Sequence, residues 1–389
     1  MPKTASAIWD SWSAIATRLP ADLDLDQLAR SSGAILRRRG DGIGDAASLL
    51  QLIFARGPGG KSLQDTVAWA RMNGVAELAA QSLNARLHQS VAFLDALLHR
   101  LLTARHAGKP LLWSGRCLRI ADGSSLSQPG SKGTDWRLHG VYDLGSGSFS
   151  HLEITDQRGA ESLLRCAPAT NEVRIADRGY AKAKDLRAFL AQSDTGGQDF
   201  IVRVGWKALA WSDAKGDPFN LIHHLQTYPA GTESQEWAVQ AQVGSTKRPS
   251  LLPLRLIAVP LPPDRAEAAR LRVKRTASKH QDRTDPRTLL AAGFMVLATS
   301  LPANIPAAEI YAVYRLRWQI ELAFKRLKSL LHVDRLPTRT RGGSLSWLYA
   351  HLILLLLAED ICHDVLESSP SGARCRWPAF ALARVQDGT

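Results

Sequence analysis

The sequence predicts an α/β protein in which a mixed sheet flanked by helices follows an all-helical N-terminal region. Through residues 1–108 apolar residues recur at helical spacing, and strand-like alternation is absent. From Trp113 onward, short apolar runs separated by turn signals alternate with helical segments, which is typical of strands and helices in one domain. At 389 residues the chain is long enough for two or three domains.

The N-terminal region is expected to contain helices over 46–54, 63–70 and 91–102. A glycine break at 72–74 separates two short helices, and a basic cluster lies upstream at 37–39. This pattern is compatible with a DNA-binding helix-turn-helix. Short helices split by glycine are also common in ordinary α domains, so both interpretations stay open.

The next segment predicts a sheet. Strands are expected at 117–121, 136–144, 149–155, 172–176 and 200–205, with helices at 161–166 and 181–192 and a last strand at 293–299. This order matches the ribonuclease-H-like arrangement, which we assign to 109–206 and 293–340. We expect 207–292 to be an inserted, mostly β subdomain carrying a basic helical arm. Residues 341–389 would form a C-terminal helical region with a possible role in dimerisation.

Three acidic residues stand out against this framework. Asp122 and Asp177 each follow an apolar strand, and Glu321 lies in a helix expected to run from 307 to about 331. On that helix Tyr314, Arg317, Glu321 and Lys328 fall within an arc of roughly 60°. The ordinary explanations are turn residues at strand ends and an i,i+4 ion pair between Arg317 and Glu321. Three carboxylates from two strands and one helix are also what a two-metal phosphoryl-transfer site requires.

Charge and cysteine content narrow the possible partners. Lys and Arg number 49 against 36 Asp and Glu, a net charge of +13, which favours a polyanion but also fits a basic enzyme of another kind. The four cysteines form no C-x-x-C pair, which argues against a zinc module or disulfide framework and favours a cytoplasmic protein. The longest apolar run is too short to span a membrane.

Together these residues resemble the bacterial insertion-sequence transposases of the DDE class, most closely the insertion sequence four (IS-four) group with its Tyr-x2-Arg-x3-Glu-x6-Lys signature. Tyr314, Arg317, Glu321 and Lys328 complete that signature, and Asp-Gly-Ser and Asp-Arg-Gly-Tyr motifs begin at Asp122 and Asp177. The resemblance covers about residues 110–335.

The resemblance implies a role for each matching residue. Asp122, Asp177 and Glu321 would bind two Mg²⁺ or Mn²⁺ ions, with no nucleotide cofactor. Tyr314, Arg317 and Lys328, with the neighbouring Lys325, would contact DNA phosphates. Relatives carry a stacking Trp where this chain has Met295, so Met295 would contact a base without an aromatic face.

The resemblance also implies a reaction and a setting. Residues 1–108 would recognise the terminal inverted repeats of double-stranded DNA, and a homodimer would cut each end in trans. Water would nick one strand, and the freed 3′-OH would form a hairpin on the opposite strand. After reopening, the 3′-OH would attack target DNA. The setting would be the bacterial cytoplasm, at the nucleoid.

Two classes of alternative remain at the level of sequence. A domesticated or inactive relative would act only as a nuclease or a DNA-binding protein, with the same residues in place. A carboxylate-based glycoside hydrolase would use two acids without the basic stripe, and the net charge disfavours it.

Overall fold

The computed structural model describes residues 12–34, 42–106, 113–192, 197–229, 231–244, 250–331 and 336–367. The basic cluster at 37–39 and the predicted C-terminal region beyond residue 367 lie outside these ranges. In the part of the chain that is described, no helix is both long and apolar enough to cross a membrane.

The described N-terminal segments are helical, as predicted. The helices are α2 (Trp12–Ala16), α3 (Leu25–Ser31), α4 (Ala46–Arg56), α5 (Leu63–Met72), α6 (Ala80–Gln89) and α7 (Val91–His106). Local chemistry fixes their ends. Ser62 and Asp65 form a reciprocal capping box at the start of α5. Gly74 follows that helix with a φ of 64°, in the left-handed region that glycine adopts readily.

Within the described ranges, nine strands form a single mixed sheet in the order β3-β2-β1-β4-β5-β9-β8-β7-β6. They are β1 (Cys117–Leu126), β2 (Trp136–Asp143), β3 (Ser148–Asp156), β4 (Glu172–Ala176), β5 (Asp199–Arg203), β6 (Trp211–Ser212), β7 (Gln235–Val243), β8 (Ser250–Pro260) and β9 (Phe294–Thr299). Strands β1, β4 and β5 run parallel, and the remaining neighbours are antiparallel. The mixed α/β class expected from the sequence is therefore confirmed.

The segment 207–292 extends this sheet. Strand β8 pairs with β9 along six positions, from Arg255 with Thr299 to Pro260 with Phe294, so the hydrogen-bonded ladder continues from the core into the insert. Three helices accompany its strands: α9 (Leu221–Gln226), α10 (Pro263–Lys279) and α11 (Pro286–Ala291). Whether the insert is a subdomain in its own right stays a prediction.

The prediction of a helix at 161–166 is wrong. Only a single 3₁₀ turn forms there, η1 (Leu163–Arg165). The buried guanidinium of Arg174 explains the difference, because its Nη1 donates to the carbonyl oxygens of Leu163 and Cys166. Both carbonyl groups therefore face this guanidinium, which fixes the backbone of the segment around the 3₁₀ turn.

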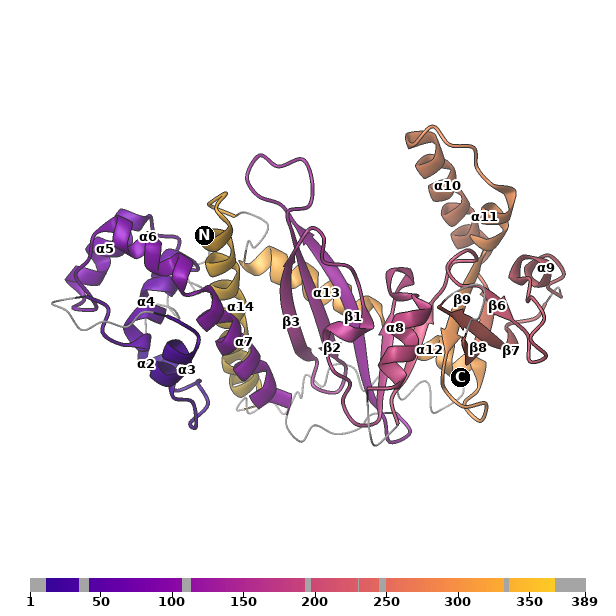
Figure 1. The fold of residues 1–389 in the computed structure, drawn as a ribbon, viewed down its shortest axis with the longest axis horizontal. Coiled ribbons are helices and arrows are strands. Elements are labelled where there is room, and N and C mark those ends of the chain that lie inside the picture. The colour runs from indigo at the N-terminus through magenta and orange to yellow at the C-terminus, as the bar shows by residue number, and fades with distance from the viewer. Residues whose placement is uncertain are drawn as a thin grey trace.

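Helices cover both faces of the sheet (Figure 1). The last described helices are α12 (Ala307–Arg315), α13 (Trp318–Leu331) and α14 (Arg341–Glu367), and α8 (Ala183–Leu190) follows β4 through the 3₁₀ turn η2 (Arg178–Tyr180). Helix α13 packs on β1 and β2, whereas the apolar side of α8 belongs to the core on the other face. Helices α7 and α14 lie together beside β3, so the N-terminal helices and the end of the described chain meet.

Candidate active site

The parallel pairing of β1 with β4 sets Asp122 and Asp177 side by side. Ala121 pairs with Ala176, and each aspartate is the next residue along its chain. Asp177 begins the turn η2. Asp122 remains inside β1, which continues to Leu126 because its pairing with β2 places Asp122 opposite Gly140. The expectation that Asp122 ends its strand is therefore wrong, because the register with β2 holds the Gly123–Ser125 segment extended.

Helix α13 brings Glu321 to the same region. Its Phe324 packs against Gly140, where an added Cβ would lie 3.0 Å from the ring and 2.8 Å from Phe149. Arg317 then joins two of the acids: its Nη1 lies 3.5 Å from Asp122 Oδ2, and its Nη2 donates to Glu321 Oε1. Residues 195 positions apart in the chain thus meet through one guanidinium.

The predicted single helix over 307–331 is wrong, because it divides into α12 and α13 at Leu316 and Arg317. The amides of both residues donate to carbonyl oxygens three positions back, those of Val313 and Tyr314. Such 3₁₀ bonds tighten the turn and redirect the chain. The four signature residues therefore lie at the end of α12, in the junction and on α13.

The remaining predicted residues take different positions around the acids. Tyr314 is buried, and its hydroxyl is close enough to Asp177 for that charge to affect its pKa. Lys328 donates to the carbonyl oxygen of Ser125, at 2.9 Å. Lys325 is exposed on α13. Met295 is half-buried near the start of β9 and packs against the larger of the two hydrophobic cores.

Burial governs the electrostatics of these groups. It raises the pKa of Asp122 to about 6, while the Gly123 amide and Arg317 act in the opposite direction. Burial also raises the pKa of Tyr314, and the Asp177 charge raises it further. The pKa of Arg203 is lowered by burial and by the nearby Arg178. A cluster of incompletely solvated charges of both signs results.

Two further charged residues lie here that the sequence patterns did not single out. Arg203 ends β5, and its Nη1 lies 3.8 Å from Asp177 Oδ1. Glu161 lies against Gly179, where an added Cβ would fall 1.6 Å from Glu161 Oε2, and its charge raises the pKa of Asp122. Arg203 is the last residue of β5 but lies inside the strand predicted at 200–205, so no strand-end signal marked it in the sequence. Glu161 sits in the loop before η1 and carried no such signal.

The three acids have the right donor atoms for a divalent cation, but their arrangement fits such an ion only in part. Carboxylate oxygens are the donors that Mg²⁺ prefers, and Asp177 Oδ1 is buried without a hydrogen-bond donor. Against this, no three His, Cys, Asp or Glu side chains among the described residues gather closely enough to enclose an ion. Arg317 bonds to Asp122 and Glu321, so binding an ion there requires it to turn away from them.

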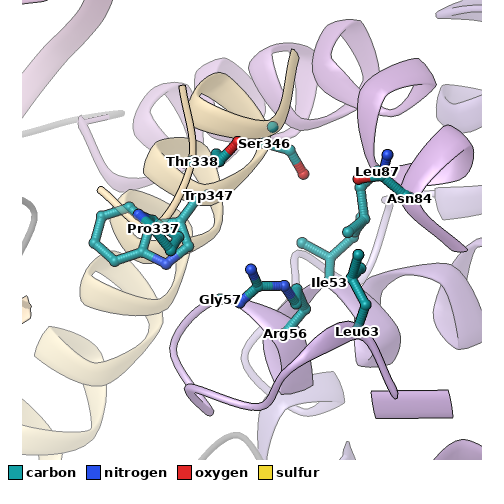
Figure 2. A pocket seen from close by; sticks show the side chains of 11 residues that line it. Ile53, Arg56, Gly57, Leu63, Asn84, Leu87, Pro337, Thr338, Ser346 and Trp347 are labelled. Atoms are coloured by element: carbon teal, nitrogen blue, oxygen red, sulfur yellow. The ribbon is translucent and has the colours of Figure 1, made fainter. Parts of the chain in front are cut away.

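A cavity of about 250 Å³ lies elsewhere, between α4, α5 and α6 and the start of α14 (Figure 2). Arg56 and Asn84 contribute from the N-terminal helices, and Thr338, Ser346 and Trp347 from the opposite side. None of the three acids lines it. The cavity is therefore separate from the carboxylate cluster.

Comparison with known proteins gives a consistent family. Residues 113–357 match the family described as Transposase DDE domain. Over 365 residues the chain is 40% identical to InsL for insertion sequence element IS186A from Escherichia coli (strain K12), covering 94% of this chain and 97% of that one. It is also 40% identical, over 366 residues and with the same coverage, to the transposase for insertion sequence element IS421 from Escherichia coli.

A solved structure is a more distant match. The piggyBac transposase synaptic complex with hairpin DNA aligns with a TM-score of 0.41 and 10% identity, over 98% of this chain and 76% of that chain. A likeness this remote assigns neither fold nor function.

Proposed function

This chain belongs to the family of DDE-domain transposases, and from that membership we propose that Asp122, Asp177 and Glu321 are the carboxylates with which it cuts and joins DNA. It is a transposase, an enzyme that moves an insertion sequence by cut-and-paste transposition. The observation that carries the residue assignment is Arg317, which contacts Asp122 and Glu321 together, beside the adjacent Asp177. The charges of all three acids act on Arg317 or are affected by it, which supports a shared role.

We also propose that the catalytic core of the protein has a ribonuclease-H-like fold. Its support is the strand order β3-β2-β1-β4-β5, with β1 to β3 antiparallel and β1, β4 and β5 parallel. In an open sheet of this kind, ligands bind at the carboxyl ends of the parallel strands. Asp177 and Arg203 lie at those ends, and Asp122 lies where the parallel pairing of β1 stops.

Transposases of this family use divalent metal ions, and we assign two Mg²⁺ or Mn²⁺ ions to the three acids. Bound there, two ions would stabilise the attacking and leaving oxygens of an in-line displacement at phosphorus. Arg317 would turn from the carboxylates toward a DNA phosphate, since guanidinium binds either anion through paired N–H groups. Each step exchanges one phosphodiester or water oxygen for another, so no nucleotide cofactor is required.

We assign the DNA contacts to the residues around the acids. Arg317, Lys325 and Lys328 are cations on or next to α13 and suit phosphate oxygens, while the buried Tyr314 would position Arg317 and Asp177. Met295 would contact a base at the cleaved end, and hairpin formation would proceed without an aromatic at that position.

The larger assembly extends the same proposal. Residues 1–108 would recognise the inverted repeats, and two copies would cut the two ends in trans, in the bacterial cytoplasm at the nucleoid. The described side chains of α14 up to Leu357 pack on α4, α6 and α7 of the same chain. A dimerisation role for 341–389 stays a prediction, and the mass of the protein–DNA complex by light scattering tests the dimer.

The test uses linear DNA carrying the ends of the protein's own element, with Mg²⁺ or with EDTA. Wild-type protein should cleave the ends only with metal. Glu321→Gln should lose cleavage by at least about a hundredfold, because the side chain keeps its shape but loses its charge. Glu233→Gln, at an exposed site, is the matched control and should cleave normally. Full cleavage by Glu321→Gln would overturn the assignment. A hairpin product would support the Met295 role, and strand transfer separates a transposase from a simple nuclease.

A further inference from the structure

Helix α10 stands away from the sheet with little of its surface in a core (Figure 1). Of its seventeen residues, Ala266 is the one buried. Two residues separate it from the end of β8, and it leads through the loop at 280–285 into α11. Stability of the sheet does not require a helix this exposed.

The charges of α10 are sorted along its length and around its axis. Its acids, Asp264 and Glu267, lie in the first turns, and the following residues 268–279 carry five Lys or Arg and no acid. Arg265, Arg272 and Lys279 are seven residues apart, so at ~100° per residue they share a stripe about 40° wide. All three are exposed, and none forms an ion pair or hydrogen bond with the described residues.

The other side of α10 has a structural role. Arg270 donates to the carbonyl oxygen of Leu289 at 3.4 Å, and it lies close to Gly293. This contact holds the helix against α11 and the start of β9. An ordinary solvated helix would balance its cations with acids one turn away, and α10 does not do so after Glu267.

The topology places α10 at the edge of the sheet where the acids lie. Pro260, at the end of β8, pairs with Phe294 at the start of β9. Arg203, at the end of β5 and beside Asp177, pairs with Leu297. The strand that leads into α10 is thus three strand spacings from β4 across the sheet, or ~14 Å. At ~1.5 Å per residue, the helix extends the cationic stripe over about 21 Å.

We propose that Arg265, Arg272 and Lys279 bind the phosphate backbone of double-stranded DNA beside the cleavage site. A duplex whose scissile phosphate lies at Asp177 would meet the stripe roughly four to eight base pairs away, at ~3.4 Å per base pair. The contact is independent of sequence, because it reaches phosphates and not base edges. The inference rests on the transposase activity, but not on which acids perform it.

The test compares two triple variants of the full chain that lose the same charge. Arg265→Gln/Arg272→Gln/Lys279→Gln removes the stripe. Lys184→Gln/Arg187→Gln/Lys215→Gln removes three exposed cations, two from α8, which packs on the core face opposite α13, and one from the turn after β6. Fluorescence anisotropy with a duplex of about 40 base pairs, in EDTA and over a series of salt concentrations, gives Kd and its salt dependence.

Each neutralised phosphate contact contributes ~0.9 to the slope of log K against log salt concentration. The α10 variant should therefore lower the slope by about 2 to 3 and weaken binding at least tenfold. The control should change the slope by less than about 1. Equal slopes for the two variants would overturn the proposal, whatever the outcome of the cleavage assay. Both proteins should keep the wild-type melting temperature, since neither set of side chains is buried.

A second measurement tests the position of the contact. Two element-end duplexes are compared, each trimmed to about three base pairs on one side of the cleavage position. One of these two duplexes should bind the α10 variant and the wild-type protein with equal affinity. A deficit that persists on both would show that the stripe binds elsewhere. Because EDTA prevents catalysis, failure of the acid assignment leaves this readout intact.

Discussion

The side chain of Arg174, on β4, is fully buried. Its charge is balanced by that of Glu172, which is equally buried. Arg174→Met should destabilise the fold by about 3–5 kcal/mol, because Glu172 would keep a buried charge without its closest partner. Adding Glu172→Gln should restore much of that loss. Urea unfolding measures both, and Arg287→Met, which breaks an exposed ion pair with Asp285, is the control and should have no measurable effect. Equal effects of the two Arg variants would contradict this account.

Two histidines on the same face of the sheet should make the protein sensitive to acid. Burial lowers the pKa of His139 to about 4 and that of His151 to about 4, with nearby cations or histidines acting in the same direction. The unfolded chain has the ordinary value near 6.5, so it takes up protons first as pH falls. Their contribution to stability is therefore complete above about pH 6.5 and lost progressively toward pH 4.

Melting temperature measured between pH 7 and pH 4 tests this sign. His139→Gln should reduce the fall, because one proton-binding group of the unfolded state is gone. His280→Gln, at an exposed position, should follow the wild-type curve. A steeper fall in His139→Gln than in wild type would show that the neutral ring is not the source of the sensitivity.

At the scale of elements, the position of α13 on the sheet depends on the absence of a side chain at Gly140. An alanine there would bring a methyl group within 3.0 Å of the rings of Phe149 and Phe324. Those rings are packed together with centroids 5.4 Å apart, so α13 must shift to make room. Gly140→Ala should cost about 1–3 kcal/mol of stability and reduce end cleavage, because Glu321 moves away from Asp122.

The combination of Gly140→Ala with Phe324→Leu separates these two causes. Removing ring volume should recover cleavage relative to Gly140→Ala alone, if displacement of α13 is responsible. Gly133→Ala is the matched control, because no atom lies within 4 Å of the added methyl group. Cleavage by Gly140→Ala at the wild-type rate would show that Glu321 does not depend on this packing.

The elements also show which parts of the fold the sequence could predict. Strand β4 was predicted at its observed bounds, since a short apolar run with turn residues on both sides leaves little choice. The continuation of β1 through Gly123 and Ser124 was not, because only the partner strand keeps those residues extended. No Gly or Pro lies between 307 and 331, so the division between α12 and α13 had no local signal.

Part of the candidate site could likewise be predicted from the sequence, and part could not. Asp122, Asp177 and Glu321 were predicted, because motif spacing reports residue type and order. Their linkage through Arg317, and the presence of Arg203 and Glu161, depend on tertiary contacts that spacing does not contain. The sequence therefore predicts which acids form the candidate site, whereas the ion pairs around those acids are visible only in the fold.

At the scale of the whole molecule, the N-terminal helices and α14 share one hydrophobic core. Phe93 and Leu97 on α7 belong to the same buried cluster as Ile353 and Leu356 on α14, and Arg105 donates to the carbonyl oxygen of Leu356. The predicted N-terminal and C-terminal helical regions, which are far apart in the sequence, are therefore packed together. This arrangement connects the proposed end-recognition region to the catalytic sheet through helix packing.

Residues 113–367 produced alone should consequently aggregate, because the apolar side of α14 would lose the partner it has in α7. Co-expression with residues 1–108 should recover a soluble complex that elutes as one species, with both fragments in equal amounts. Leu97→Asp in the shorter fragment is the control and should abolish recovery, since a buried carboxylate cannot replace that contact. A monomeric, folded 113–367 fragment would show instead that the sheet and its helices are stable without the N-terminal region.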